Sequence, residues 1–201
     1  LGGGLGVYDK VHPNDDVNKG QSTNDVIPTA GKIALIRYFM DLSDETKNLI
    51  NSLEAKSKEF EDVIKMGRTQ LQDAIPISLG QEFKAYATVI KRDLKRFDMA
   101  IDALSSVNLG GTAIGTGLNA DITYVNEIVG VLSEITGLDL KQSEDLVDGT
   151  QNLDCFLYAS SILKTYAASL SKISNDLRLM SSGPQSAIAD NKLPATQAGS
   201  S

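Results

Sequence analysis

The sequence predicts an all-α protein built as a bundle of long helices. Apolar residues recur at intervals of three and four along several long stretches, which is the spacing of one helix face. Aromatic residues make up only 5% of the chain and tryptophan is absent, which disfavours a β-sandwich or barrel. No run of alternating apolar and polar residues is long enough for a strand. With 201 residues, 41% of them hydrophobic, the chain can bury a sizeable core.

The first long helix is expected after an irregular beginning. Residues 1–24 are rich in Gly, Asn and Asp, which is typical of a loop. Pro28 suits the first turn of a helix, with Asn24 or Asp25 as its cap. One amphipathic helix is then predicted as far as residue 63, because apolar residues follow at helical spacing at Leu35, Phe39, Leu42, Leu49, Leu53, Phe60 and Val63.

A connecting loop and a second helix come next. Residues 67–77 contain Gly67, Pro76 and clustered polar side chains, and they are expected to form the loop. Ser78 followed by Gln81 has the spacing of a capping box, which opens a helix. The apolar stripe of this helix is predicted at Phe83, Tyr86, Ile90, Leu94, Phe97, Ile101 and Leu104.

A flexible stretch separates this helix from two further ones. Residues 108–120 carry four glycines and are expected to lack regular structure. Asp121 is predicted to cap a shorter helix that Gly137 ends. From residue 156 to residue 180 apolar side chains recur in steps of three and four, which is the pattern of a heptad seam.

The predicted helices are long for a chain of this size. The three longest would span about 29 to 39 residues, or roughly 43–58 Å at 1.5 Å per residue. A compact monomer of this length measures only about 35–40 Å across. Either the bundle has long solvated ends or it is shared between subunits, and the heptad seams favour the second arrangement.

Charge and composition exclude several classes of protein. Lys and Arg number 19 against 26 Asp and Glu, a net charge of −7, so no basic face is available for nucleic acid. No apolar stretch approaches the length of about 18 residues that a membrane span needs.

The single cysteine, Cys155, cannot form an internal disulfide, so a reducing cytoplasm is expected. Because neither Leu1 nor Ser201 has the setting of a natural terminus, we expect an internal piece of a longer protein.

The first polar segment that could carry chemistry is residues 21–25, Gln-Ser-Thr-Asn-Asp. It places short hydrogen-bond donors just before a predicted helix N-terminus, where backbone N–H groups and the positive end of the helix dipole favour an anion. The alternative is that Ser22, Thr23 and Asn24 simply cap the helix and its lead-in turn.

The second polar segment is residues 67–74, in which Asp73 could fix Arg68. The side chains that could orient a carboxylate or an amine are Arg68, Thr69, Gln70 and Gln72. The alternative is a hydrogen-bonded loop whose charges pair with each other. A third segment, Gly-Ser-Ser at residues 199–201, indicates nothing by itself.

Other catalytic patterns are missing from the sequence. His12 is the only histidine, and no Gly-x-Ser-x-Gly elbow accompanies it for a Ser–His–Asp relay. No His and Cys cluster has metal-ligand spacing, so no metal is expected. The glycines of residues 108–120 follow a predicted helix, whereas a dinucleotide fingerprint follows a strand. We therefore expect no cofactor.

Together, the polar segments resemble the aspartase/fumarase superfamily. Residues 14–30 are similar to its first signature, residues 67–83 to its second, and residues 193–201 to the start of its third, a serine loop. Their order and spacing agree with the superfamily, and the resemblance covers essentially all 201 residues.

Within the superfamily the sequence is most similar to the aspartate ammonia-lyases. Residues 66–74 carry Gln70 where fumarases have His, although some aspartases also have His there. Residues 107–119 and 175–184 resemble aspartases as well. His12 and its neighbours resemble instead the secondary carboxylate site of class II fumarases, but Asp9 stands where that site has Arg.

The resemblance implies the reversible deamination of L-aspartate to fumarate and ammonia through a carbanion. Ser200, the serine after the loop glycine, is then the expected general base. The carbanion is delocalised as an aci-carboxylate, a doubly charged group that needs preorganised donors. The residues expected to bind the substrate are Ser22, Thr23, Asn24, Thr69, Gln70 and Ser201.

The resemblance also implies a fold and an assembly. The superfamily has three domains, and its five-helix central bundles assemble as a homotetramer whose active sites each take residues from three subunits. Residues 1–23 are expected to end the first domain, and residues 24–201 to begin the central one. Because an upstream Gly-Thr-Ser segment and the Lys and Asn after Ser201 are absent, the fragment alone is expected to be inactive.

Three alternatives stay open at this stage. A class II fumarate hydratase would have the same fold and a similar carbanion. A non-catalytic scaffold on the same bundle, as in the lens crystallins of this superfamily, would be free to lose the polar residues that are present here, namely Ser22, Thr23, Asn24 and Ser200. A coiled-coil adaptor would not need the polar segments at all.

Overall fold

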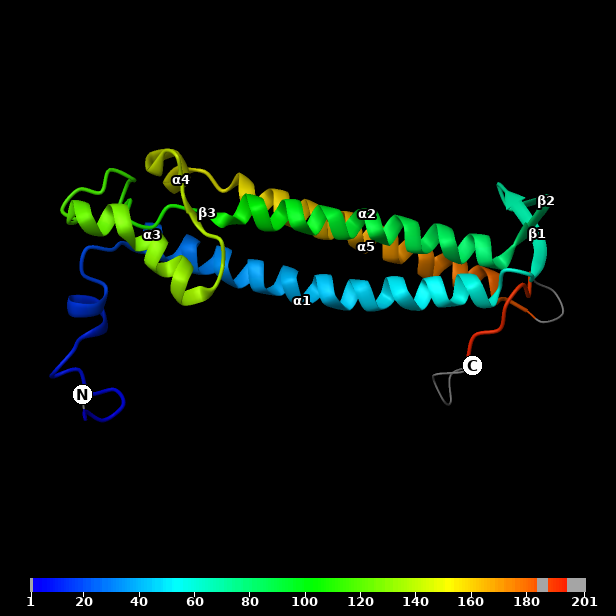
Figure 1. Cartoon of the computed structure of the whole chain (residues 1–201), viewed down its shortest axis with the longest axis horizontal. Coiled ribbons are helices and arrows are strands. Elements are labelled where there is room, and N and C mark those ends of the chain that lie inside the picture. The colour runs from blue at the N-terminus through cyan, green and yellow to red at the C-terminus, as the bar shows by residue number, and fades with distance from the viewer. Residues whose placement is uncertain (1, 184–187, 195–201) are drawn as a thin grey trace. The chain divides into compact units, whose positions relative to one another are not determined.

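The structure is a computed structural model that describes residues 2–183 and 188–194. Its long helices are α1 (Thr23–Glu59), α2 (Leu79–Ser105) and α5 (Asp154–Met180), and its shorter ones are α3 (Ile122–Thr136) and α4 (Leu146–Gln151). These helices dominate the described chain (Figure 1). The prediction of an all-α bundle of long helices is therefore confirmed.

The chain divides into two compact units. The first comprises Leu1–Asp41 and Phe97–Ser160, and the second comprises Leu42–Arg96 and Ser161–Ser201. Helices α1, α2 and α5 each contribute to both units. The expected domain boundary between residues 23 and 24 stays a prediction.

Helix α1 begins close to its predicted start but ends at Glu59, four residues before Val63. Pro28 is the sixth residue of the helix rather than part of its first turn. Its missing N–H therefore removes an internal hydrogen bond that a helix would otherwise form. The buried face of α1 includes Ile36, Phe39, Thr46, Ile50 and Leu53.

In the first unit, aromatic rings and a helical glycine bring the helices together. Phe39 of α1 and Phe97 of α2 pack with ring centroids 5.7 Å apart. A Cβ atom at Gly31 would lie 3.5 Å from the ring of Phe156 in α5. Asp121 caps α3, and Gly137 ends it with a left-handed φ of 67°, as predicted.

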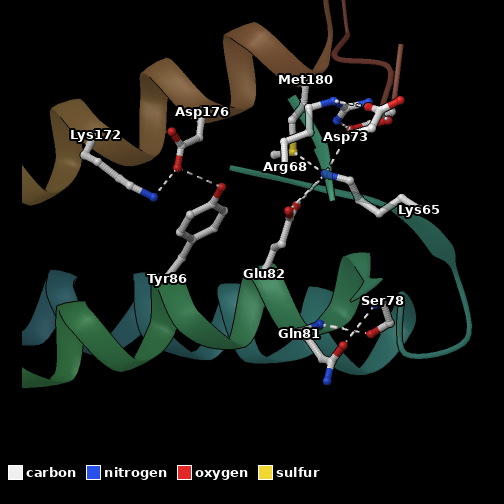
Figure 2. A network of polar contacts seen from close by, with 11 residues as sticks. Lys65, Arg68, Asp73, Ser78, Gln81, Glu82, Tyr86, Lys172, Asp176 and Met180 are labelled. Atoms are coloured by element: carbon white, nitrogen blue, oxygen red, sulfur yellow. Dashed lines mark hydrogen bonds and ion pairs between the residues drawn. The ribbon is translucent and has the colours of Figure 1, made fainter. Parts of the chain in front are cut away.

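In the second unit, α1, α2 and α5 make polar contacts with one another. Thr46 of α1 donates from Oγ1 to the Tyr166 hydroxyl of α5 at 3.1 Å. Tyr86 of α2 donates to the Asp176 carboxylate of α5 at 3.1 Å. The predicted capping box is also confirmed, because Ser78 and Gln81 exchange hydrogen bonds of 3.0 and 3.1 Å (Figure 2).

The expectation that the chain forms no strand is wrong. Strands β1 (Ile64–Thr69) and β2 (Gln72–Ser78) pair as an antiparallel hairpin in place of the predicted loop. Short strands β3 (Ser106–Val107) and β4 (Lys141–Gln142) pair in parallel. The hairpin escapes a search for alternation because most of its side chains are exposed and its register shifts beside Gly67, where a bulge interrupts the period of two.

Two short helices also lie outside the predicted elements. A π-helical turn, η1 (Pro13–Val17), lies within the predicted N-terminal loop, where His12 accepts N–H bonds as its cap. Helix α4 starts at the cap residue Asp145 and is too short to show an apolar stripe. Among the described helices, none combines the length and the apolarity needed to cross a lipid bilayer.

Candidate functional site

The first group of candidate residues surrounds the amino terminus of α1 in the first unit. The Ser22 hydroxyl accepts the N–H of Asn24 at 3.2 Å, and the Ser22 carbonyl accepts the N–H groups of Asp25 and Val26 at 3.2 and 3.0 Å. Ser22 therefore acts as the helix cap, which is the alternative that the sequence left open for it. This role does not use the hydroxyl proton, which stays available to a ligand.

Thr23 and Asn24 both have exposed side chains at the same helix end. The amide nitrogen of Asn24 donates to the Ala113 carbonyl at 2.7 Å. This bond fixes the amide plane, and the other amide N–H and the amide oxygen have no partner among the residues that the structure describes. The Thr23 hydroxyl forms no hydrogen bond within the described residues. Hydroxyl and amide donors thus meet the positive end of a 37-residue helix, a setting that favours a carboxylate.

A tyrosine adds a neutral hydroxyl close to this group. Gln21 donates from Nε2 to the Tyr124 hydroxyl at 2.8 Å. Burial raises the pKa of Tyr124, and the nearby carboxylate of Asp25 raises that pKa further, although the bond from Gln21 acts in the other direction. Tyr124 therefore keeps its proton at neutral pH and does not add negative charge to the site.

The second group, Thr69 and Gln70, lies at the turn of the β1–β2 hairpin in the second unit. Both side chains are exposed. Gln70 and Leu71 form the two-residue turn with φ angles of 51° and 63°, in the left-handed region that hairpin turns require and that Gly or Asn usually supply. For other residues this conformation costs about 1–2 kcal/mol each, and such strain is found preferentially at functional sites.

Below the turn, a compact ion-pair network holds the hairpin. Lys65 Nζ lies 2.9 Å from Glu82 Oε1 and 2.9 Å from Asp190 Oδ2, and it approaches Met180 Sδ at 3.3 Å. Arg68 donates from Nη1 to Asp190 Oδ2 at 2.6 Å. Figure 2 shows Lys65 reaching Glu82 and the sulfur of Met180. Two cations and two carboxylates therefore neutralise each other within one cluster.

This network answers the question that the sequence left open for Arg68. The predicted partner, Asp73, is mostly exposed and lies 3.6 Å from Arg68 Nε, whereas Asp190 is the close partner. The hydrogen bond to Asp190 raises the pKa of Arg68. Burial alone would raise the pKa of Asp190, but hydrogen bonds from Arg68 and Lys65 outweigh it and hold that pKa below its ordinary value. Arg68 thus pairs closely with a carboxylate outside residues 67–74, which neither interpretation of the sequence predicted.

A cavity of about 420 Å³ lies beside the hairpin turn in the second unit. Gln70 and Leu71 form part of its wall together with Lys65, Arg68 and Glu82 of the network. On its helical side the Tyr86 hydroxyl donates to Asp176, which also pairs with Lys172. Burial and the Asp176 carboxylate raise the pKa of Tyr86 far above neutral pH. The cavity is lined by Lys65, Arg68, Gln70, Leu71, Glu82, Ala85, Tyr86, Lys172, Asp176, Leu179, Met180 and Ile188.

The candidate residues belong to different parts of the chain. The predicted base Ser200 and its neighbour Ser201 lie outside the described residues. Ser22, Thr23 and Asn24 belong to the first unit, whereas Thr69 and Gln70 belong to the second. In residues 2–183 and 188–194, no group of three His, Cys, Asp or Glu side chains is placed to hold a metal ion.

His12 has a local structural role. The Nδ1 atom of its ring accepts the backbone N–H groups of Asn14 and Asp15 at 3.2 and 3.1 Å. The backbone N–H of His12 donates to Asp16 Oδ2 at 2.7 Å. In the residues that resemble a secondary carboxylate site, His12 therefore forms hydrogen bonds within its own turn, to residues 14–16.

Sequence reasoning missed Lys65 and Asp190. Neither lies in a helix stripe, and 125 positions separate them, so no local pattern connects them. One signal was present: Lys65 and Arg68 lie close together in the predicted loop region, although the carboxylates of Glu59, Glu61 and Asp62 come just before them in the sequence and conceal the distant partner. Two neighbouring cations of this kind require acidic partners from elsewhere in the chain when they are buried.

Comparisons with known proteins cover the whole chain. A family model described as Lyase matches residues 1–201. An aspartate ammonia-lyase from a Bacillus species is 48% identical over 201 residues, which is 100% of this chain and 43% of that relative. The chain therefore spans about 43% of the length of the curated relative that it matches.

Two crystal structures extend the comparison to the fold. The structure of fumarate lyase:delta crystallin from Brucella melitensis bound to cobalt has a TM-score of 0.93 and 49% identity, over 97% of this chain and 42% of that one. A recombinant class II fumarase from Schistosoma mansoni has a TM-score of 0.88 and 34% identity, over 96% and 43% of the two chains.

Proposed function

Because this chain belongs to the lyase family that matches it from residue 1 to residue 201, we propose that the protein carrying it is an aspartate ammonia-lyase. It converts L-aspartate reversibly to fumarate and ammonia. The observation that carries this proposal is the cluster of hydroxyl and amide donors formed by Ser22, Thr23 and Asn24 at the amino terminus of α1. The 48% identity to an aspartate ammonia-lyase supports the choice of substrate.

The proposed reaction begins with removal of a proton from the carbon beside the side-chain carboxylate of aspartate. The electron pair of that C–H bond delocalises into the carboxylate and forms an aci-carboxylate with two negative charges. Donors that are already oriented stabilise this charge without reorganising at the moment of reaction. Ser22, Thr23 and Asn24 are suited to this task, because one end of a long helix presents all three.

Ser200 is the proposed general base, by the resemblance of residues 193–201 to the serine loop. A serine hydroxyl is a weak base in water, so it acts in its ionised form within a site that excludes water. The carbanion then expels ammonia as the C–N bond breaks, which leaves fumarate. Thr69, Gln70 and Ser201 are proposed to orient the two carboxylates and the amine.

Gln70 supports ammonia-lyase activity over the fumarase alternative. A hydratase has to position and activate water, which suits an imidazole that titrates near neutral pH. An amide can only donate and accept hydrogen bonds. It suffices where the leaving group is an amine and no water has to be activated.

We propose that the complete protein is a cytoplasmic homotetramer with active sites formed by three subunits. The exposed apolar side chains of α5 support an assembly, since Leu157 is 72% and Leu179 is 42% exposed in the chain alone and such faces are usually covered. The reduced state expected for Cys155 supports the compartment. Residues 24–201 are then the first part of a central domain.

The test is a pair of incubations of the full-length protein. L-aspartate is supplied in one and L-malate in the other, and fumarate is followed by its ultraviolet absorbance. The proposal expects fumarate from L-aspartate, with ammonia in equal amount, and negligible fumarate from L-malate. Fumarate from L-malate at a comparable rate would favour a fumarase, and no reaction with either would favour a non-catalytic bundle.

A further inference from the structure

Asp25 is a buried carboxylate directly after the three donors of α1. Its side chain is fully shielded from solvent, at 0% exposure. Oδ1 accepts the N–H of Ser22 at 2.9 Å, and Oδ2 accepts the N–H of Thr112 at 2.9 Å. One carboxylate thus connects the start of the helix to the glycine-rich stretch of residues 108–117.

Burying a carboxylate at this position costs free energy. The two N–H groups that it accepts explain why an aspartate is nevertheless found here. Within residues 2–183 and 188–194, Asp25 has no cationic partner, although a buried charge without one is strongly disfavoured. An asparagine would avoid that charge, but it offers one acceptor oxygen where two N–H groups need one each. The charge also lies beside a cluster suited to anions. The role of Asp25 is therefore to hold the backbone N–H groups of Ser22 and Thr112 in place, and its negative charge is not what the neighbouring donors require.

The partner N–H belongs to a strained residue. Thr112 has a φ of 59°, which β-branched residues rarely adopt. Such a conformation persists only where surrounding contacts hold it. The bond to Asp25 aligns the stretch so that the neighbouring carbonyl, that of Ala113, accepts the Asn24 amide at 2.7 Å. The orientation of a candidate substrate-binding side chain thus depends on the contact between Asp25 and Thr112.

A second connection supports the same arrangement. Pro28 lies four residues after Asn24 and has no N–H, so the Asn24 carbonyl lacks its usual helical partner. The buried side chain of Asn108 supplies the donor from Nδ2 at 3.0 Å, and it also reaches Thr150 Oγ1 at 3.1 Å. Its own Oδ1 is buried with no partner in the described residues. Because an unused buried acceptor is unfavourable, the donor bonds are the reason for an amide here.

We propose that Asp25 is a positioning residue for the reaction: it holds Ser22 and Asn24 in the orientation that stabilises the aci-carboxylate, with Asn108 as its second support. The inference rests on the proposed function. It adds to that function a group that does not touch the substrate but sets how well the donors fit the transition state. Donors that are displaced by a fraction of an ångström still bind the ground-state substrate. They no longer stabilise fully the negative charge that develops only in the transition state.

The test compares Asp25→Asn with Asp93→Asn in the full-length protein. Asp93 is equally buried and has Arg96 as its hydrogen-bond partner in the second unit. Asp25→Asn is expected to lower kcat for L-aspartate about 10²-fold with KM within about threefold. Asp93→Asn is expected to keep kcat within about threefold even if it lowers the unfolding midpoint. A folded Asp25→Asn variant with kcat within threefold of wild type would overturn the proposal.

Hydrogen–deuterium exchange separates this inference from the proposed function, because it needs no turnover. Peptides covering residues 21–27 and residues 108–117 are expected to exchange at least about tenfold faster in Asp25→Asn and unchanged in Asp93→Asn. Unchanged exchange in Asp25→Asn would refute the positioning role even if L-aspartate proves not to be the substrate. A wild-type protein without lyase activity would refute only the proposed function.

Asn108→Ala covers the case in which Asp25→Asn does not fold. It removes the donor to the Asn24 carbonyl and leaves Asp25 in place. It is expected to lower kcat about tenfold with little change in KM, since one of the two supports remains. A folded Asn108→Ala variant with wild-type kcat and wild-type exchange in residues 21–27 would count against the proposal.

Discussion

The carboxylate of Asp190 accepts a hydrogen bond from Arg68 Nη1 at 2.6 Å, so a segment after α5 is attached to the hairpin that carries Thr69 and Gln70. Asp190 is only 10% exposed and also pairs with Lys65 at 2.9 Å. Backbone bonds support the contact, because the N–H of Asp190 donates to the Met180 carbonyl at 2.9 Å. The hairpin turn is therefore positioned by residues far away in sequence.

Replacing Asp190 by Asn is expected to lower the free energy of unfolding of the full-length protein by about 1.5–3 kcal/mol. The substitution removes a charge-assisted acceptor and leaves the largely buried Lys65 and the partly buried Arg68 with fewer partners. Denaturant unfolding measures the change. The matched control is Asp44→Asn, whose pair with Lys47 is mostly exposed and is worth less than about 1 kcal/mol. Equal effects of the two substitutions would contradict the importance of the network.

The contribution of Asp190 is also expected to depend on pH in a defined direction. Its pKa is lowered in the folded protein relative to about 3.9 in an unfolded chain. The stabilisation is therefore fully present above about pH 4 and is lost as pH falls through the lowered folded pKa. Measured by denaturant unfolding, the difference in stability between wild type and Asp190→Asn should be constant from pH 7 to pH 5 and shrink below pH 4. A difference in stability that grows on acidification would show that folding raises the pKa of Asp190 instead of lowering it.

Gly115→Ala is expected to be strongly destabilising, by at least about 2–3 kcal/mol. Gly115 has a φ of +89°, and a Cβ atom there would overlap the Leu146 carbonyl and the backbone of Val147. The control is Gly130→Ala in the exposed middle of α3, where a Cβ meets nothing within 4 Å. That change is expected to stabilise by about 0.5–1 kcal/mol, because alanine favours a helix interior. Thermal unfolding of both variants measures the contrast, and a mild effect of Gly115→Ala would disprove the close packing.

Helices were predictable here because their signals are local. The capping box of Ser78 and Gln81 and the stop at Gly137 each depend on a few neighbouring residues. The hairpin was missed for the opposite reason. Its turn residues, Gln70 and Leu71, adopt left-handed angles that neither residue type favours, so only the completed tertiary structure makes this turn possible.

The candidate site was predictable as a set of polar segments but not as a geometry. Ser22, Thr23 and Asn24 could be placed at a helix end from their order in the sequence. Which groups hold them could not, because Asp25 reaches Thr112 across 87 positions. Contacts between residues so far apart in sequence are determined by tertiary packing, which the local periodicity of a sequence does not reveal.

Ser200→Ala in the full-length protein is expected to lower kcat by at least about 10²–10⁴-fold, which is the usual contribution of a general base. Binding of fumarate, measured by calorimetry, should survive, because the other donors remain. Ser52→Ala is the matched control: this exposed serine of α1 donates only to the Asn48 carbonyl, and kcat should be unchanged. A Ser200→Ala variant that keeps more than about a tenth of wild-type kcat would assign the base to another residue.

Gln70→His tests whether the residue at position 70, in the hairpin turn, decides between ammonia-lyase and hydratase activity. We expect the unmutated full-length protein to deaminate L-aspartate and to hydrate fumarate negligibly, because a neutral amide donates and accepts hydrogen bonds but cannot take a proton from water as a base. The variant should fold, since His tolerates the left-handed φ of 51° at this position better than most residues. It should keep deaminase kcat within about tenfold, because the amine leaves without an activated water and aspartases of this superfamily carry either residue.

The two activities of the Gln70→His variant are measured in the same preparation, by fumarate absorbance with L-aspartate and by malate formation from fumarate. Gln72→His is the control, because it places an imidazole on the neighbouring strand β2 without changing the turn itself. A rise in fumarate hydration confined to Gln70→His would support a water-activating role for an imidazole at residue 70. If the unmutated protein hydrates fumarate as fast as it deaminates L-aspartate, Gln70 does not separate the two reactions and the assignment as an ammonia-lyase fails.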